Sequence, residues 1–243
     1  MRIGTERMRR SFPLWLWNEH LARYLFAANF VANKIVVDCA CGAGIGSNIF
    51  LKKGAAHLIG FDLSQEAIDI AMGNNKDVSN GDFYVANSNS LPLEKDYAEV
   101  FISLETIEHI QEDSLFLKEV SRVMKSKGVF ICSTPNRTVT NPGTNLGHKP
   151  WNSFHVREYS QAEFLSLMHE EFEEVEMYGL NGISLSVLTF ENKLRKIFFI
   201  NGYVWTNMKK FLKIFWDDID NYKIEKVAAD YEYEYLIAVC SKK

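Results

Sequence analysis

The chain has 243 residues, of which 47% are hydrophobic, and a formal net charge of −4. This apolar content excludes an intrinsically disordered chain, and the acidic balance argues against a general nucleic-acid binder, which is usually basic. The length suits one α/β domain with an appendage.

The first half of the chain predicts strands that alternate with helices. Residues 14–32 repeat apolar side chains at helical spacing, and residues 34–38 form a β-branched run that ends in an acid. A glycine-rich turn at 41–46 leads into a helix over 47–53. The same unit then recurs, with strands expected at 57–62, 82–86, 97–103 and 129–134 and helices at 65–72, 105–109 and 113–125.

The second half predicts a long loop and an insertion. Residues 135–158 are rich in proline and glycine, and long loops in compact domains are commonly functional. A helix over 160–170 and strands over 172–178 and 233–240 follow. We therefore expect an α/β fold with a Rossmann-like, mostly parallel sheet of seven strands and helices on both faces. The expected units are an N-terminal helical cap (1–33), the sheet domain (34–180 and 231–243) and a helical insertion before the last strand (181–230).

The glycine-rich turn after the first strand indicates a ligand site. Gly42, Gly44 and Gly46 let the backbone approach a ligand at the carboxyl end of that strand. A P-loop would need a lysine before Ser47, and a dinucleotide fingerprint would need a third glycine in place of Ser47. A purely structural tight turn stays an alternative for the glycines taken alone.

An acid also ends the second strand. Asp62 lies 20 residues past Gly42, where a carboxylate accepts hydrogen bonds from the two hydroxyls of a ribose. This position fits NAD and S-adenosylmethionine (SAM) alike. The alternative is that Asp62 caps the next helix, although Ser64 can serve as that cap.

Several short motifs, in chain order, resemble those of class I SAM-dependent methyltransferases. They are residues 37–46 (VDCACGAGIG), 60–64 (GFDLS), 87–92 (NSNSLP), 100–109 (VFISLETIEH) and 122–128 (RVMKSKG). Residues 19–27, 133–137 and 152–159 also resemble a narrower group of bacterial methyltransferases tied to cell-surface glycan and secondary-metabolite gene clusters. The resemblance covers roughly residues 15–180 and leaves 181–230 outside.

The resemblance implies SAM as the cofactor and assigns residues to bind it. These residues are Asp38, Ala40, Gly42, Gly44, Asp62, Leu63, Asn87, Ser88 and Leu104. In this assignment Asp38 and the turn face the amino-acid end of SAM, and Asp62 holds the ribose. Asn87 and Ser88 meet the adenine amine, and Leu104 and Glu105 line the methionine side near the methyl group. Asn87 stands where the family usually has an acid, but its amide oxygen can still accept from the adenine amine.

The expected reaction is methyl transfer to a hydroxyl of a sugar, a glycan intermediate or another small molecule, for which a base must remove the proton. His155, in the long loop, is the first candidate because imidazole titrates near neutral pH. A structural role through Arg157 or Glu158 is the alternative. Glu105 and His109, four residues apart on one expected helix face, are the next candidates, with capping or packing as the alternative. No His, Asp or Glu cluster has convincing metal-ligand spacing, so we expect no metal.

Other functions stay open. The acceptor can equally be an amino sugar or small amine that is methylated on nitrogen. In a different class, the chain is a non-catalytic SAM-binding protein. An NAD-dependent enzyme is disfavoured by Ser47 and by the later motifs.

The segment 188–216 is aromatic and basic, with six Lys or Arg against one Glu, a net charge of 6 − 1 = +5. We expect it to be a lid over the acceptor, a homodimer arm, a helix at the membrane surface, or a helical pair packed on the core. Its charge suits a phosphate-bearing acceptor.

The cysteines and the N-terminus bear on location. Cys39, Cys41, Cys132 and Cys240 include no CxxC pair, so we expect buried free thiols and a reducing, cytoplasmic setting. The N-terminus lacks the apolar run of a signal peptide. No uncharged apolar run approaches the ~18 residues of a membrane span.

Overall fold

The computed structural model describes residues 13–197, 204 and 221–242. The helices described are α1 (Leu14–Ala27), η1 (Ala28–Phe30), α2 (Ile45–Lys52), α3 (Gln65–Asn74), η2 (Ile107–His109), α4 (Asp113–Val123), α5 (Arg137–Thr140), α6 (Gln161–Met168) and α7 (Leu185–Ile197). The strands described are β1 (Ile35–Cys39), β2 (His57–Asp62), β3 (Gly81–Val85), β4 (Ala98–Leu104), β5 (Met124–Pro135), β6 (Glu174–Ser184), β7 (Ile224–Lys226) and β8 (Tyr231–Ser241).

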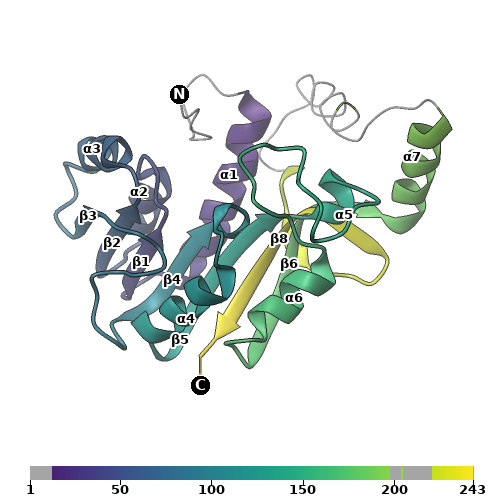
Figure 1. Cartoon of the computed structure of the whole chain (residues 1–243). Helices are drawn as coiled ribbons and strands as arrows, with labels where there is room; N and C mark the ends of the chain where they lie inside the picture. The colour runs from purple at the N-terminus through teal and green to yellow at the C-terminus, as the bar shows by residue number, and fades with distance from the viewer. Residues whose placement is uncertain (1–12, 198–203, 205–220, 243) are drawn as a thin grey trace.

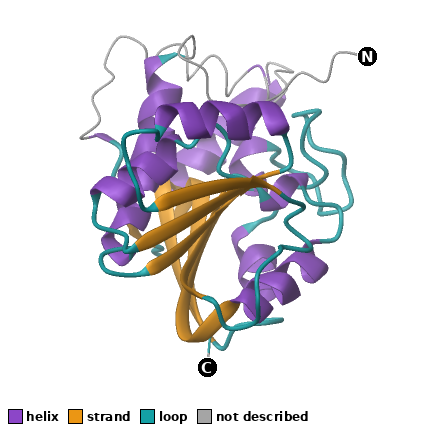
Figure 2. Ribbon diagram, turned by 90° about the vertical axis from the view of Figure 1, so that its left-hand side faces the viewer, coloured by secondary structure: helices purple, strands orange, loops and turns teal. Residues whose placement is uncertain are grey.

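Over these residues the strands form one sheet in the order β3-β2-β1-β4-β5-β8-β6-β7. The first five strands are parallel, and β8 runs antiparallel between β5 and β6. Helices lie on both faces of the twisted sheet (Figures 1 and 2). The predicted Rossmann-like α/β fold is therefore confirmed.

The number of strands differs from the prediction. We expected seven, and the part of the chain that the structure describes has eight. The additional strand is β7, which pairs antiparallel with β6 inside the segment predicted as a helical insertion. Its three residues are too few to show a period-two pattern, so only the pairing with β6 reveals the strand.

The central strands are near-continuous apolar runs because the sheet buries them on both faces. Successive side chains of a strand point to opposite faces. Val37 and Phe101 accordingly join one core cluster, while Val36 and Val100 join the other. The carboxyl ends of these parallel strands meet at one edge of the sheet, which is where an open α/β sheet binds its ligand.

The predicted insertion (181–230) is only partly described. β6 continues to Ser184 and leads directly into α7. Of the basic segment 188–216, the structure describes 188–197 and 204, and the rest of that prediction lies outside the described residues. None of the helices in the described ranges has the length and hydropathy that crossing a membrane requires. All four cysteines are buried and free, as predicted.

Candidate functional site

The turn after β1 has an unusual backbone conformation. Ala40, Gly42 and Gly44 all have positive φ angles, of 62°, 54° and 69°. Gly44 stands directly before α2, and a Cβ atom there would lie 2.7 Å from the Asn75 side-chain nitrogen. The Asn75 amide instead donates a hydrogen bond to the Gly44 carbonyl at 3.1 Å. The end of α3 thus fixes the turn, and only glycine fits at position 44.

Two carboxylates lie beside this turn. Asp38 is buried and accepts a hydrogen bond from the Ser47 hydroxyl at 2.5 Å. Burial raises the pKa of Asp38 to about 6; the charge of Asp62 adds to this effect and the Ser47 hydrogen bond opposes it. Asp62 accepts from the backbone N–H of Gly42 at 3.0 Å and of Ser64 at 2.9 Å. Asp62 therefore ties β2 to the turn.

Ser64 is the side-chain cap of α3. Its hydroxyl accepts a hydrogen bond from the Ala67 N–H. Ser64 therefore provides the side-chain cap that the alternative reading assigned to Asp62, and it pairs one of the free N–H groups of the first turn.

The next predicted residues lie along the same edge, after β2 and β3. Leu63 is 75% exposed, which is unusual for leucine and leaves an apolar surface open beside Asp62. Asn87 is exposed, and its side-chain oxygen accepts from the Asn89 N–H at 2.9 Å, which forms a local turn. Ser88 is half-buried next to it. The adenine role of Asn87 and Ser88 stays a prediction.

Arg23 of α1 is a site residue that the sequence analysis missed. Its side chain is 1% exposed, its Nε lies 3.7 Å from Glu105, and its guanidinium lies 4.3 Å from the centre of the Tyr235 ring. None of its three guanidinium nitrogens has a hydrogen-bond partner. Burial lowers the pKa of Arg23, but Glu105 and other neighbours outweigh this and hold it above its ordinary value. The cation is therefore permanent and buried.

The residue after Arg23, Tyr24, lies against the helix that follows the glycine-rich turn. A Cβ atom at Gly46 would lie 2.6 Å from the ring of Tyr24, the residue that follows Arg23. The negative charge of Asp38 is one of the causes that raise the pKa of Tyr24, after burial. The start of α2 therefore borders Tyr24, and Glu105 at the end of β4 borders Arg23. Nothing in the spacing of α1 distinguishes Arg23 from a surface arginine.

The end of β4 corrects one prediction. Leu104, half-buried, is the last residue of the strand, and Glu105 follows with a positive φ of 52°. The short helix η2 begins only at Ile107, so Glu105 and His109 do not share a helix face. The left-handed backbone at Glu105 ends the strand and prevents a continuous helix over 105–109. Glu105 instead accepts a hydrogen bond from the Ser133 hydroxyl at 2.7 Å.

His155 lies buried in the loop between α5 and α6. Its Nδ1 is 2.6 Å from a Glu158 oxygen, and its Nε2 is 2.9 Å from the Asn152 amide nitrogen. Burial alone would raise the pKa of Glu158, but hydrogen bonds from His155 and Thr140 bring it below its ordinary value. Of the two partners considered for His155, Glu158 is the one found, because Arg157 pairs with Asp113.

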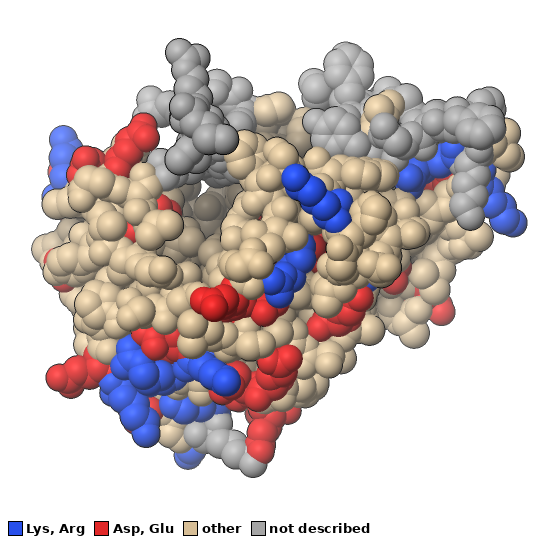
Figure 3. Space-filling view, viewed as in Figure 1, with Lys and Arg blue, Asp and Glu red and all other residues tan. Residues whose placement is uncertain are grey.

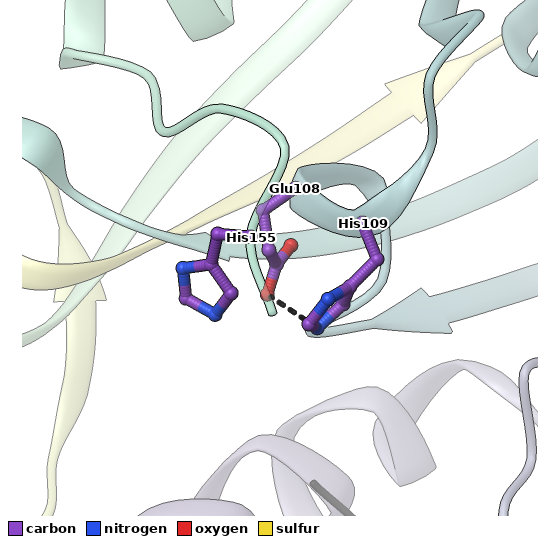
Figure 4. Close-up of side chains that lie close together, drawn as sticks. All are labelled: Glu108, His109 and His155. Atoms are coloured by element: carbon purple, nitrogen blue, oxygen red, sulfur yellow. Dashed lines mark ion pairs between the residues drawn. The ribbon is translucent and has the colours of Figure 1, made fainter. Parts of the chain in front are cut away.

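The fold brings His155 to His109 and to Glu108, which the sequence analysis had not singled out. The two imidazole rings are 4.9 Å apart and nearly perpendicular. Figure 4 shows the Glu108 carboxylate between them, with one oxygen 3.9 Å from His109 Nε2. Burial, and then the charge of Glu105, raise the pKa of Glu108 well above its ordinary value. Since 46 residues separate His109 from His155, their spacing gave no signal of this cluster.

The surface near this edge is hollowed. The space-filling view shows a hollow between the region of α2 and α3 and the region of α1, and the atoms around it are mostly uncharged (Figure 3).

Comparisons with known proteins agree on one family. Residues 37–132 match the model of a methyltransferase domain. A probable S-adenosylmethionine-dependent methyltransferase of Mycolicibacterium smegmatis is 31% identical over 160 residues, which is 66% of this chain and 60% of that protein. A ubiquinone biosynthesis O-methyltransferase of Pelagibacter ubique is 30% identical over 105 residues, or 43% of each chain. The matched part of the chain thus spans 60% or less of the length of both relatives.

A solved structure shows the same fold. A SAM-dependent methyltransferase of Thermotoga maritima, described as a possible histamine N-methyltransferase, superposes with a TM-score of 0.62. The alignment covers 94% of this chain and 93% of that chain at 15% identity. At this identity the likeness concerns the fold and not the acceptor.

Proposed function

This chain carries a class I SAM-dependent methyltransferase domain, and on that premise we propose that the protein transfers a methyl group from SAM to a hydroxyl of a sugar, a glycan intermediate or another small molecule. The cofactor part of the proposal is supported by the charges at the sheet edge. The acceptor part is supported by the histidines of the long loop and of η2.

The polar groups at the edge fit those of SAM. The Asp38 carboxylate suits the ammonium group, Asp62 suits the ribose hydroxyls, and exposed Leu63 suits a face of the adenine. Arg23 is the observation that carries the proposal. Its buried guanidinium has no hydrogen-bond acceptor, and a buried cation is costly unless an anion with acceptor atoms joins it. The carboxylate of SAM supplies such an anion.

The chain's own residues would then prepare the acceptor. Bound SAM supplies a methyl group that its sulfonium charge already activates. The acceptor oxygen has to lie in line behind that group and lose its proton. Because Glu158 holds Nδ1 of His155, the lone pair of this imidazole lies on Nε2, where it can take a proton. His109 and Glu105 follow β4 at the same edge.

Nitrogen methylation is the second candidate. The relative from Pelagibacter is named an O-methyltransferase, whereas the Thermotoga structure is described as a possible N-methyltransferase. A buried histidine paired with a carboxylate favours the hydroxyl acceptor, because an amine needs only to be neutral when it attacks. A non-catalytic SAM-binding protein would have no need of this pair.

The remaining expectations belong to the same proposal. The sheet domain (34–180 and 231–243) binds SAM behind the N-terminal cap (1–33), and the insertion (181–230) shapes the acceptor side. The basic charge of 188–216 supports a phosphate-bearing acceptor. The four buried free cysteines support a reducing, cytoplasmic location.

Calorimetry and methyl-transfer assays test the proposal. We expect the protein to bind SAM and S-adenosylhomocysteine but not NAD, and to move a radiolabelled methyl group from SAM onto nucleotide sugars. Tight NAD binding without SAM binding would overturn the proposal. His155→Ala should nearly abolish transfer to a hydroxyl, whereas an amine acceptor should be less sensitive.

The Arg23→Gln variant distinguishes binding of the amino-acid end of SAM from binding of its nucleoside end. Losing a hydrogen bond between charged groups should weaken SAM binding about 10- to 100-fold. Binding of 5′-methylthioadenosine, which lacks the amino-acid tail, should stay unchanged. Equal weakening of both ligands would contradict the assignment of Arg23 to the carboxylate.

A further inference from the structure

Glu108, His109 and His155 form a cluster to which SAM binding assigns no role. One ligand atom from each residue lies within 4.8 Å of the ligand atoms of the other two. Two of the residues come from η2 and the third from the loop before α6 (Figure 4). We propose that these three side chains bind one divalent transition-metal cation.

The hydrogen bonds of the two histidines orient them as metal ligands. His109 Nδ1 lies 2.9 Å from the Phe154 carbonyl oxygen, so Nδ1 carries the proton and Nε2, which faces Glu108, carries the lone pair. His155 Nδ1 likewise donates to Glu158. Metal-binding histidines typically donate their other ring N–H to a carboxylate or a backbone carbonyl in this way. The Asn152 amide now donates to Nε2 of His155, and the cation would replace that contact.

The distances and the burial suit a reactive metal site. Ligands about 2.1 Å from a tetrahedral ion lie about 3.4 Å apart, so the widest pair has to close by at most about 1.4 Å. Glu108 and His155 are buried, whereas His109 is exposed. Three protein ligands with one open side leave a coordination position for an outside molecule, as catalytic sites do.

The ligand set indicates the kind of cation. Two imidazoles and one carboxylate favour zinc and similar transition metals, while magnesium and calcium prefer sites made of oxygen atoms.

The role of the cation rests on the methyl transfer proposed above. A bound divalent cation lowers the pKa of an oxygen acid that approaches it. The acceptor hydroxyl would lose its proton to solvent at the exposed side. Its oxygen would then form the new bond to the methyl carbon, while the carbon–sulfur bond of SAM breaks and its electron pair stays on sulfur. In this state the histidines are ligands, and His155 does not take the proton itself.

Metal analysis of the chelator-treated full-length protein tests the inference. We expect one zinc or cobalt ion per chain after reloading and dialysis, a rise in Tm with zinc, and no competition from excess magnesium. His109→Ala, which removes the exposed ligand, should weaken zinc binding at least about 100-fold. Glu158→Gln should weaken it about 10- to 100-fold, as loss of a histidine's supporting partner does in metal sites.

His57→Ala is the matched control. His57 begins β2, at the opposite end of that strand from Asp62, and pairs with Asp82 at 3.4 Å, so its loss should leave zinc binding unchanged. No zinc or cobalt bound to the wild-type protein, or equal binding by the His109→Ala variant, would overturn the inference. SAM calorimetry on the same samples separates the two proposals. SAM binding without zinc binding refutes only the metal site. Zinc binding without SAM binding leaves the metal site standing, but refutes the methyl transfer and with it the role given to the cation.

Discussion

The ionisation of Asp38 makes the stability of the folded protein depend on pH. This carboxyl group is buried, the charge of Asp62 acts on it, and it accepts a side-chain hydrogen bond from Ser47. Burial raises its pKa to about 6 in the folded protein, against about 3.9 for a free aspartic acid. The folded state therefore keeps a proton between pH 4 and 6 that the unfolded chain releases. Asp38 adds to stability below about pH 4, and that contribution is lost as the pH rises through 6.

SAM affinity should rise with pH, whereas the contribution of Asp38 to stability falls. In the proposed site the Asp38 anion pairs with the ammonium group of SAM, so SAM binding should weaken about tenfold between pH 7 and pH 5. Calorimetry across this range measures the effect. Asp38→Asn should bind SAM weakly at every pH and show no such slope. An unchanged slope in this variant would assign the pH dependence to another group.

At the scale of elements, the contact between α1 and α2 shapes the cofactor edge. Gly46, in the first turn of α2, allows the Tyr24 ring to lie against the helix backbone. The same ring meets the edge of Phe50 at 6.3 Å between centroids. Because this packing holds α1 in place, it also fixes the part of α1 that carries Arg23.

Gly46→Ala should break this contact. The added methyl group would lie 2.6 Å from a Tyr24 ring carbon, and overpacking of this kind costs about 1–3 kcal/mol of the free energy of unfolding. SAM binding should weaken as well, since α1 has to shift. Gly73→Ala in α3 is the control, because nothing lies within 4 Å of its new methyl group. It should raise stability by about 0.5–1 kcal/mol. Denaturant unfolding of both variants measures the two changes in the free energy of unfolding. A Gly46→Ala variant as stable as the wild type would contradict the prediction.

At the scale of the whole molecule, α1 is tied to the last strands of the sheet. Glu19 of α1 accepts from the Tyr235 hydroxyl of β8 at 2.7 Å and from the Asn181 amide of β6 at 3.0 Å. Asn181 also donates to Glu234 at 3.0 Å. The two ends of the described chain are therefore joined through buried polar groups on the side of the sheet that carries Arg23.

Tyr235→Phe should weaken this link. It removes a donor from the buried Glu19 carboxylate, which costs about 1–3 kcal/mol of the free energy of unfolding. Tyr178→Phe is the matched control because its partner Glu176 is exposed, and it should leave stability unchanged. Thermal unfolding of both variants compares them. Equal Tm values for the two would show that the link contributes nothing.

The sequence by itself determined the fold class and predicted which residues of the candidate cofactor site share one edge of the sheet. Glycines that need positive φ, and acids that end consecutive parallel strands, are local features, and the chain order places them at one sheet edge. Asp38, Gly44 and Asp62 are found there for that reason. The apolar runs of the central strands likewise predicted a parallel sheet, because strands that are buried on both faces have nearly continuous apolar sequences.

Only the tertiary structure decided the rest. Arg23 becomes notable through its burial and its missing acceptors, and neither property is visible in an amphipathic helix pattern. Glu108, His109 and His155 meet because η2 and a distant loop fold onto the same edge. The expectation of no metal-ligand cluster rested on spacing along the chain, whereas coordination depends on distance in space. β7 exists because β6 offers it a neighbour, since a three-residue strand forms only through its hydrogen-bonded partner.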